Sequence, residues 1–192
     1  MRITKADVIQ TAADIADKNG LSNVSLKVVA ENLNIRTPSL YNHIDSLESL
    51  LREIAHNGMK TMNERMMQAA IGKIGDDAIK SIGITYLNYM IEHPGIYETI
   101  QWATWHGTEE TGKIFDNYLS LLKTLALSCN FNPVNLDEIL NLLTGVLHGY
   151  TTLQLRYAFT KPDEVRADLS AALDTVLAGL HQKYDQHEKE HL

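Results

Sequence analysis

The sequence has little of what marks secreted, disulfide-stabilised or membrane-anchored chains. Its 192 residues include one cysteine, Cys129, so no disulfide can form within the chain, and a small buried thiol is the expected role. No apolar run approaches the roughly twenty residues that span a bilayer. The first residues enter an amphipathic helical pattern without the apolar core of a secretion signal. These absences predict a cytoplasmic chain that makes no contact with a membrane.

Several recurring patterns of catalytic sites are also missing. There is no glycine-rich phosphate loop, no G-x-S-x-G segment and no cysteine beside a base. His93, His106 and His148 could approach one another in a fold, but none of these three belongs to an H-E-x-x-H or H-x-x-x-H pair. We therefore expect no enzyme activity, no catalytic residues, no metal site and no cofactor.

Charge is distributed unevenly along the chain. The formal net charge is -7, with 17 basic and 24 acidic residues. Residues 1–52 hold six basic and six acidic groups, so the whole net negative charge belongs to residues 53–192. A neutral N-terminal segment and an acidic remainder predict that any binding of nucleic acid depends on the local placement of cations, not on a strong overall field.

The positions of proline and the spacing of apolar residues predict an all-α fold. With only four prolines and few alternating patterns, apolar residues recur at helical spacing. Thr4 is expected to cap a first helix closed by Gly20, and Ser46 a long one that loosens at Gly72. Further helices are expected over residues 76–92, 97–105, 109–130, 136–160 and 162–183.

The most informative segment runs from Ser25 to His43. Ser25 is a good N-cap, and the apolar spacing after it predicts a helix that ends near Leu33. Asn34, which tolerates a left-handed backbone, supplies a turn. Thr37 is expected to cap a second helix, with Pro38 in its first turn. Two short helices joined by a tight turn have the layout of a helix-turn-helix, which places its second helix in a DNA groove.

The second helix of this pair exposes side chains suited to phosphates and base edges. Leu40 and Ile44 are expected to face inward. The candidate DNA-binding residues are Lys27, Arg36, Thr37, Pro38, Ser39, Tyr41, Asn42 and His43. An ordinary helical hairpin with a polar face is the alternative reading.

Residues 3–52 resemble the DNA-binding domain of the tetracycline-repressor (TetR) family of bacterial transcription regulators. The resemblance rests on Ala12-Ala13, Gly20, Ala30, Leu40-Tyr41 and His43. It implies a homodimer with a DNA-binding head, residues 1–47, and a helical body for ligand binding and dimerisation, residues 48–192. It also implies DNA contacts at Lys27, Thr37, Pro38, Ser39, Tyr41 and His43, with the tyrosine and histidine on phosphates.

Two positions depart from the family pattern. Asn34 stands where the family commonly has glycine, and Leu47 stands where many members have lysine. The turn can accept asparagine, whereas the leucine removes one expected phosphate contact.

Aromatic and polar side chains in the body predict a site for a small-molecule effector. An apolar pocket with a few convergent polar groups holds such ligands, although each of these residues taken singly fits ordinary helical core. Leu147 to Leu153 also resembles a His-Gly motif in one branch of TetR-type ligand domains, whereas Trp105-His106-Gly107 reads as a helix end. The candidates are Tyr86, Tyr89, Met90, Trp102, Trp105, His106, Tyr118, Leu122, Leu147, His148 and Thr151.

The last two expected helices carry apolar residues on more than one face. Because packing within one domain needs a single apolar stripe, this coverage predicts a homodimer through these helices. Core helices of a monomer are the alternative. The sequence as a whole predicts a ligand-responsive repressor that binds a palindromic double-stranded DNA operator, with an effector of unknown identity. The alternative function is a helical small-molecule-binding or adaptor protein whose head no longer binds DNA.

Overall fold

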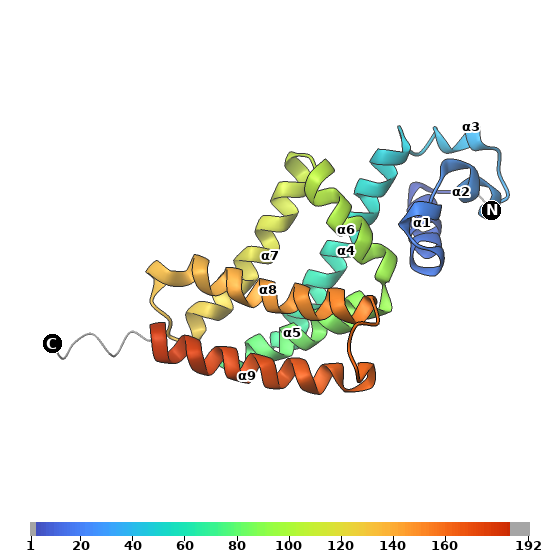
Figure 1. Ribbon diagram of the computed structural model, residues 1–192. Helices are drawn as coiled ribbons and strands as arrows, with labels where there is room; N and C mark the ends of the chain where they lie inside the picture. The colour runs from blue at the N-terminus through green and yellow to red at the C-terminus, as the bar shows by residue number, and fades with distance from the viewer. Residues whose placement is uncertain (1–2, 185–192) are drawn as a thin grey trace. The chain divides into compact units, whose positions relative to one another are not determined.

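The computed structural model describes residues 3–184, and within them the fold is all-α, as the sequence predicts (Figure 1). No strand forms in this range, and none of its helices is both long and apolar enough to span a bilayer. Short 3-10 turns precede α2, α8 and α9. The helices are α1 (Lys5–Asn19), α2 (Leu26–Asn32), α3 (Thr37–Leu40), α4 (Leu47–Ala70), α5 (Gly75–Glu92), α6 (Pro94–His106), α7 (Glu109–Ser128), α8 (Leu136–Leu155) and α9 (Val165–Tyr184).

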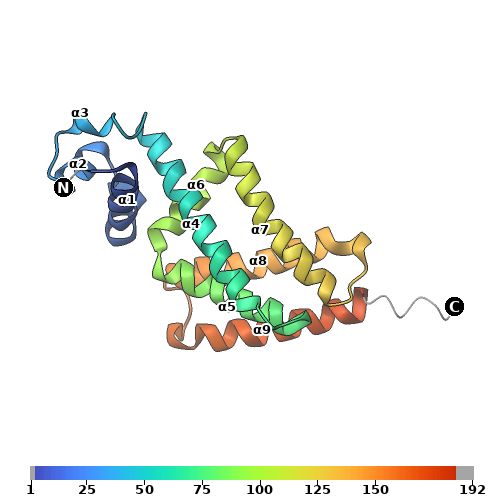
Figure 2. The same cartoon turned by 180° about the vertical axis from the view of Figure 1, so that it is seen from behind.

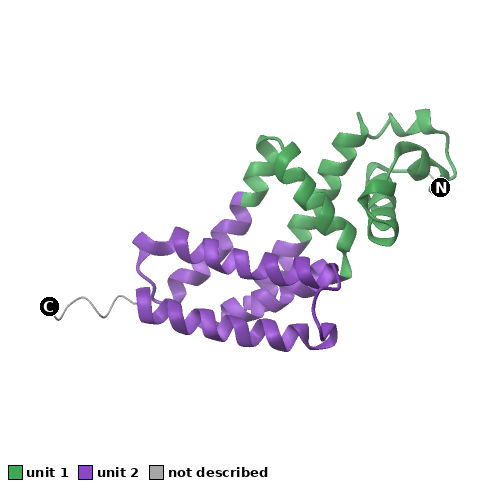
Figure 3. Cartoon of the chain, viewed as in Figure 1, with its two compact units in different colours: residues 1–61, 92–115 green, residues 62–91, 116–192 purple. Residues whose placement is uncertain are grey.

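The chain forms two compact units (Figure 3). Unit 1 comprises Met1–Thr61 and Glu92–Phe115, and unit 2 comprises Met62–Ile91 and Asp116–Leu192. Unit 1 thus joins the three N-terminal helices to the first part of α4, to all of α6 and to the first turns of α7. Helix α6 therefore packs with the N-terminal helices although α5 and most of α7 belong to unit 2.

Side-chain caps fix several helix starts at the positions that the sequence predicts. Thr4 and Asp7 form a capping box, in which the Asp7 N–H donates to Thr4 Oγ1 at 3.2 Å and the Thr4 N–H donates to Asp7 Oδ2 at 2.8 Å. The Thr4 hydroxyl also donates to Asp7 Oδ2 at 2.7 Å, and this bond, followed by the one from the Thr4 N–H, lowers the pKa of Asp7. Gly20 closes α1 with φ +85°. The Ser49 N–H donates to Ser46 Oγ at 3.0 Å at the start of α4.

Three expected helix boundaries are wrong. Arg36, not Thr37, is the N-cap of α3, and it makes no side-chain capping bond. Pro94 occupies the first turn of α6, so this helix begins before residue 97, because the fixed φ of proline suits that position. Helix α8 ends at Leu155, well before residue 160, since Tyr157 has a left-handed φ of +54°.

The core of unit 2 forms where α5 meets both C-terminal helices. Leu147 of α8 and Leu173 of α9 pack against Gly83 of α5, where an added Cβ would lie 3.0 and 2.9 Å from their Cδ atoms. Helices α8 and α9 run antiparallel and side by side in both views (Figures 1 and 2). Cys129 is buried, as expected for a small apolar side chain.

Candidate functional site

The segment from Ser25 to His43 folds as two short helices around a tight turn. Ser25 Oγ accepts a hydrogen bond from the Val28 N–H at 3.3 Å and caps α2. Asn34 adopts φ +54°, and the Ile35 N–H donates to the Ala30 carbonyl at 3.0 Å. Leu40 is fully buried and anchors α3. The helix-turn-helix geometry expected from the sequence is therefore present.

The predicted DNA-binding side chains surround this turn and remain accessible. Tyr41 is 57% exposed. Lys27 makes one ion pair, to Glu31 at 3.9 Å, and a pair of this kind between exposed side chains contributes little. Helix α3 is shorter than expected, so Tyr41, Asn42 and His43 lie in the turn that follows it. Exposed members are Lys27, Arg36, Pro38, Tyr41 and Asn42, and partly buried ones are Thr37, Ser39 and His43.

The C-terminal end of α1 binds the N-terminal end of α6. Asp17 Oδ1 accepts hydrogen bonds from the backbone N–H groups of Gly95 at 2.8 Å and Ile96 at 3.1 Å. Asp17 Oδ2 lies 2.8 Å from His93 Nδ1. A carboxylate at a helix N-terminus pairs with unsatisfied donors and with the helix dipole. Asp17 therefore joins α6 to the helix that precedes the DNA-binding turn.

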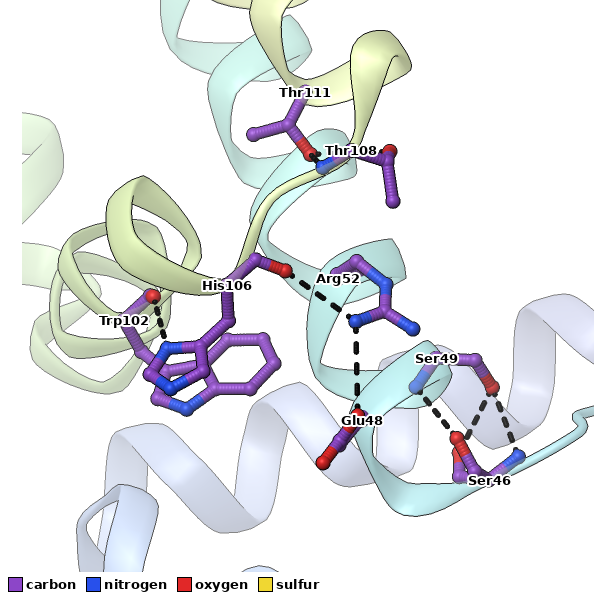
Figure 4. Close-up of polar contacts among 8 residues, drawn as sticks. All are labelled: Ser46, Glu48, Ser49, Arg52, Trp102, His106, Thr108 and Thr111. Atoms are coloured by element: carbon purple, nitrogen blue, oxygen red, sulfur yellow. Dashed lines mark hydrogen bonds and ion pairs between the residues drawn. The ribbon is translucent and has the colours of Figure 1, made fainter.

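The opposite end of α6 is held by α4 (Figure 4). Arg52 Nη1 donates to the His106 carbonyl oxygen at 3.3 Å and lies 3.9 Å from Glu48. The His106 ring stacks on Trp102, with 4.6 Å between centroids and 5° between planes, and its Nδ1 lies 2.9 Å from the Trp102 carbonyl oxygen. Trp105 on the same helix is 86% exposed.

A buried histidine connects α4 to the first turn of α7. His56 Nε2 lies 2.8 Å from Thr111 Oγ1, and Thr111 Oγ1 also accepts from the Thr108 N–H at 3.0 Å. Burial lowers the pKa of His56, and the Glu110 carboxylate, 4.0 Å from Nδ1, offsets part of that change. His56 therefore favours its neutral form in the folded chain.

Unit 2 contains a cluster of aromatic and polar side chains from α5, α7 and α8. The Tyr86 and Tyr118 rings are 6.5 Å apart, and Tyr86 meets His148 edge-on at 5.6 Å. Tyr86 Oη lies 3.3 Å from His148 Nδ1. The hydroxyls of Tyr118 and Thr151 are buried and make no hydrogen bond of normal geometry. We call Tyr86, Tyr118, Thr144, His148 and Thr151 the buried polar cluster.

Burial controls the ionisation of this cluster. It raises the pKa of Tyr118 to about 12, and the nearby Thr144 side chain offsets only part of that rise. It also lowers the pKa of His148. The cluster therefore presents an uncharged phenol and an uncharged imidazole at neutral pH.

The structure divides the predicted effector residues between the two units. Trp102, Trp105 and His106 belong to unit 1, whereas the other eight belong to unit 2. Arg65 stacks over the Tyr89 ring at 4.8 Å. Four further predicted effector residues of unit 2, outside the buried polar cluster, are buried: Tyr89, Met90, Leu122 and Leu147.

Sequence reasoning missed Asp17 and Thr144, and it weighed His93 only as a member of a histidine cluster, not as a partner of Asp17. Thr144 had a recoverable signal, because residues 144, 148 and 151 share one face of a helix. Asp17 had none, since its partners lie 76 to 79 positions away. No group of three or more His, Cys, Asp or Glu side chains in residues 3–184 is arranged to hold a metal ion.

The helix-turn-helix and the all-helical remainder define a class of DNA-binding regulators, and comparison with known proteins identifies the family. The family model for the tetracyclin repressor-like C-terminal domain matches residues 79–179. YobS, an uncharacterised HTH-type transcriptional regulator of Bacillus subtilis (strain 168), is 30% identical over 93% of each chain. The chain belongs to the TetR family and is a DNA-binding transcriptional regulator.

Solved structures with low sequence identity share the fold. A protein of unknown function from Rhodococcus sp. RHA1 has a TM-score of 0.81 at 16% identity, covering 94% of this chain and 96% of its own. A single-residue variant of TetR from Acinetobacter baumannii AYE, in complex with minocycline, has a TM-score of 0.71 at 18% identity, covering 94% and 98%. The His-Gly resemblance around His148 stays a prediction.

Proposed function

We propose that the protein is a ligand-responsive repressor that binds a palindromic operator as a homodimer. The observation that carries this proposal is the double attachment of α6 within unit 1, by Asp17 at its start and by Arg52 at its end. Helix α6 follows α5 of unit 2 directly in the chain. A displacement of α5 or α7 by an effector would therefore be passed to α1 and to the DNA-binding turn.

In the DNA complex, each exposed residue would have one of two roles. Tyr41 and His43, in the turn after α3, would bind phosphates and position the protein without reading sequence. Ser39 and Lys27 would reach base edges in the major groove, and Arg36 would supply a further cation. The two heads of a dimer would bind successive major grooves, which lie roughly 34 Å apart.

Release would follow from linkage between the two sites. In one conformation of the dimer, the spacing of the two heads would not match successive major grooves. An effector that binds this conformation better lowers operator affinity, and the operator lowers effector affinity by the same factor. To reverse an equilibrium from 1:99 to 99:1, the effector must distinguish the two conformations by about 5.5 kcal/mol.

The dimer would form through outward residues of α8 and α9 that the protomer core does not use. Leu142 and Leu153 of α8 are each 46% exposed, and the two helices also expose three glycines that have open space around them. Small residues allow close approach of a second helix pair. Leu173 belongs to the other face, because it packs on Gly83 within the protomer. The exposed glycines are Gly145, Gly149 and Gly179.

The effector site proposed here centres on the buried polar cluster. Aromatic rings supply apolar area there, while hydroxyl and imidazole groups supply orientation. The Acinetobacter TetR variant, crystallised with minocycline, supports the expectation of a small-molecule ligand in this fold. The roles of Trp102, Trp105 and His106 stay predictions. A regulator of chromosomal DNA would act in the cytoplasm.

The proposal is tested by selecting fragments of the source genome on the purified protein. We expect a palindromic motif to be enriched. In a gel shift, the protein should then specifically retard a duplex that carries this motif. The operon beside the motif then indicates the class of effector. Failure to enrich any motif would favour the alternative of a helical small-molecule-binding or adaptor protein whose head no longer binds DNA.

A further inference from the structure

We propose that the buried polar cluster selects an uncharged effector, mainly apolar, that carries a hydroxyl or carbonyl oxygen. This inference rests on the proposed function, because it names the chemical class of the ligand at the same site. It concerns which ligands enter the cluster and is independent of how the signal reaches DNA.

The cluster presents hydrogen-bonding atoms that the protein does not satisfy. Tyr118 is 5% exposed and Thr151 is fully buried, yet neither hydroxyl makes a hydrogen bond of normal geometry. A buried hydroxyl without a partner loses its bonds to water and gains none in return. Such atoms are rare in folded proteins, and two of them near one aromatic group indicate a place where a ligand completes the bonding.

Ring contacts and helix spacing link the members of the cluster to one another. Tyr118 approaches Tyr86 through its ring and Thr144 through its hydroxyl, without a well-formed hydrogen bond to the threonine, and Tyr86 contacts His148. Thr151 lies three residues after His148, on the same face of α8. The phenol of Tyr118 can donate to a ligand carbonyl or hydroxyl oxygen, and Thr151 Oγ1 can accept from a ligand hydroxyl.

A charged ligand enclosed by the cluster would meet no fully buried counter-ion from residues 3–184. Every Lys, Arg, Asp and Glu within residues 3–184 is at least partly exposed, including those of α5, α7 and α8 around the cluster. An isolated charge transferred into such surroundings loses its hydration without compensation. Burial also keeps His148 and Tyr118 neutral, so neither supplies the missing charge at neutral pH.

The experiment compares probes that share one apolar skeleton and differ in one group. On biphenyl, the probes are 4-phenylphenol and 4-acetylbiphenyl as neutral oxygen compounds, biphenyl-4-carboxylate as the anion, 4-phenylbenzylammonium as the cation, and biphenyl itself. A second series uses the corresponding naphthalenes. Binding to the full chain is measured at neutral pH by calorimetry and by the shift in Tm.

We expect the neutral oxygen compounds of at least one series to raise Tm and to bind about tenfold or more tightly than their ionised counterparts. Tyr118→Phe should weaken them by about tenfold, because each loses one hydrogen bond, and should leave biphenyl unchanged. The variant should fold normally, since it keeps the buried ring and removes a hydroxyl that makes no hydrogen bond of normal geometry. Tyr150→Phe is the matched control, because the Tyr150 hydroxyl bonds the Asp168 carbonyl outside the cluster.

Equal or tighter binding of the ionised probes would overturn the inference. So would the absence of binding by every neutral oxygen compound, or unchanged affinity in Tyr118→Phe. A gel shift on the selected operator separates this inference from the proposed function. Neutral probes that bind but release no DNA would contradict the repressor mechanism alone, whereas a charged effector that releases DNA through this cluster would contradict the inference alone.

Discussion

Asp17 and Gly95 join α1 to α6. The Gly95 N–H donates to Asp17 Oδ1 at 2.8 Å, and a Cβ on Gly95 would overlap the backbone of Ala16. The junction combines a charge-assisted cap with a close backbone approach that only glycine permits. This junction explains why α6, which lies between α5 and α7 in the sequence, belongs to unit 1 with the DNA-binding turn.

Asp17→Ala should lower the free energy of unfolding by about 1 kcal/mol, because the N-terminus of α6 loses its capping carboxylate. Urea unfolding measures the change. Asp14→Ala is the control, since Asp14 lies on the same helix, is exposed and accepts a hydrogen bond from Gln10 of that helix. Equal stability of the two variants would show that the Asp17 cap contributes nothing.

Gly95→Ala should destabilise the protein by about 1–3 kcal/mol, because the added methyl group forces α6 away from α1. Gly112→Ala provides the comparison in unit 1, where a Cβ meets no atom within 4 Å. There the substitution should be neutral or should stabilise by up to about 1 kcal/mol, as expected for alanine inside a helix. The same loss of stability in both variants would argue against the close approach to Ala16.

Stability should decrease as the pH falls below about 6.5, where histidines of the unfolded chain become protonated. Burial lowers the pKa values of His56 and His148, so the folded state binds fewer protons in this range. Unfolding by urea at pH values from about 7 to about 5 follows the effect. His56→Gln should make the decrease shallower, and adding His148→Gln should flatten it further. A profile as steep as that of the wild type in both variants would refute this origin of the pH dependence.

Leu142→Glu should convert the dimer into a folded monomer, because the charge would be buried between two helix pairs. Analytical ultracentrifugation gives the mass, and circular dichroism checks that the protomer remains helical. Leu127→Glu is the control on α7, at nearly the same exposure of 45%. A Leu142→Glu variant that remains dimeric would place the interface elsewhere.

Local sequence signals predicted local structure well. Thr4, Ser25, Ser46 and Asn34 occupy the cap and turn positions that their side chains predict, since these preferences depend on neighbouring backbone groups alone. The family resemblance agreed with the helix-turn-helix, in which Leu40 is buried and Tyr41 exposed.

Partners of helix faces could not be predicted in the same way. Helical spacing identified the apolar face of α9 but not its neighbour, and Leu173 faces α5 of its own protomer. The His93-Pro94-Gly95 segment indicated a break, whereas its close approach to α1 depends on residues nearly eighty positions earlier. Trp105 was grouped with the other aromatics by residue type, although its position on α6 leaves it exposed.

The central claim is that the segment from Ser25 to His43 reads DNA, and fluorescence anisotropy on the selected operator and on a scrambled duplex tests it most directly. At physiological salt the wild type should prefer the operator by about a thousandfold or more. Tyr41→Phe combined with His43→Ala should weaken binding to both duplexes equally, because phosphate contacts carry no sequence information. Ser39→Ala or Lys27→Ala should reduce the preference itself. Equal wild-type affinity for the two duplexes, or a preference that none of these variants alters, would contradict the claim.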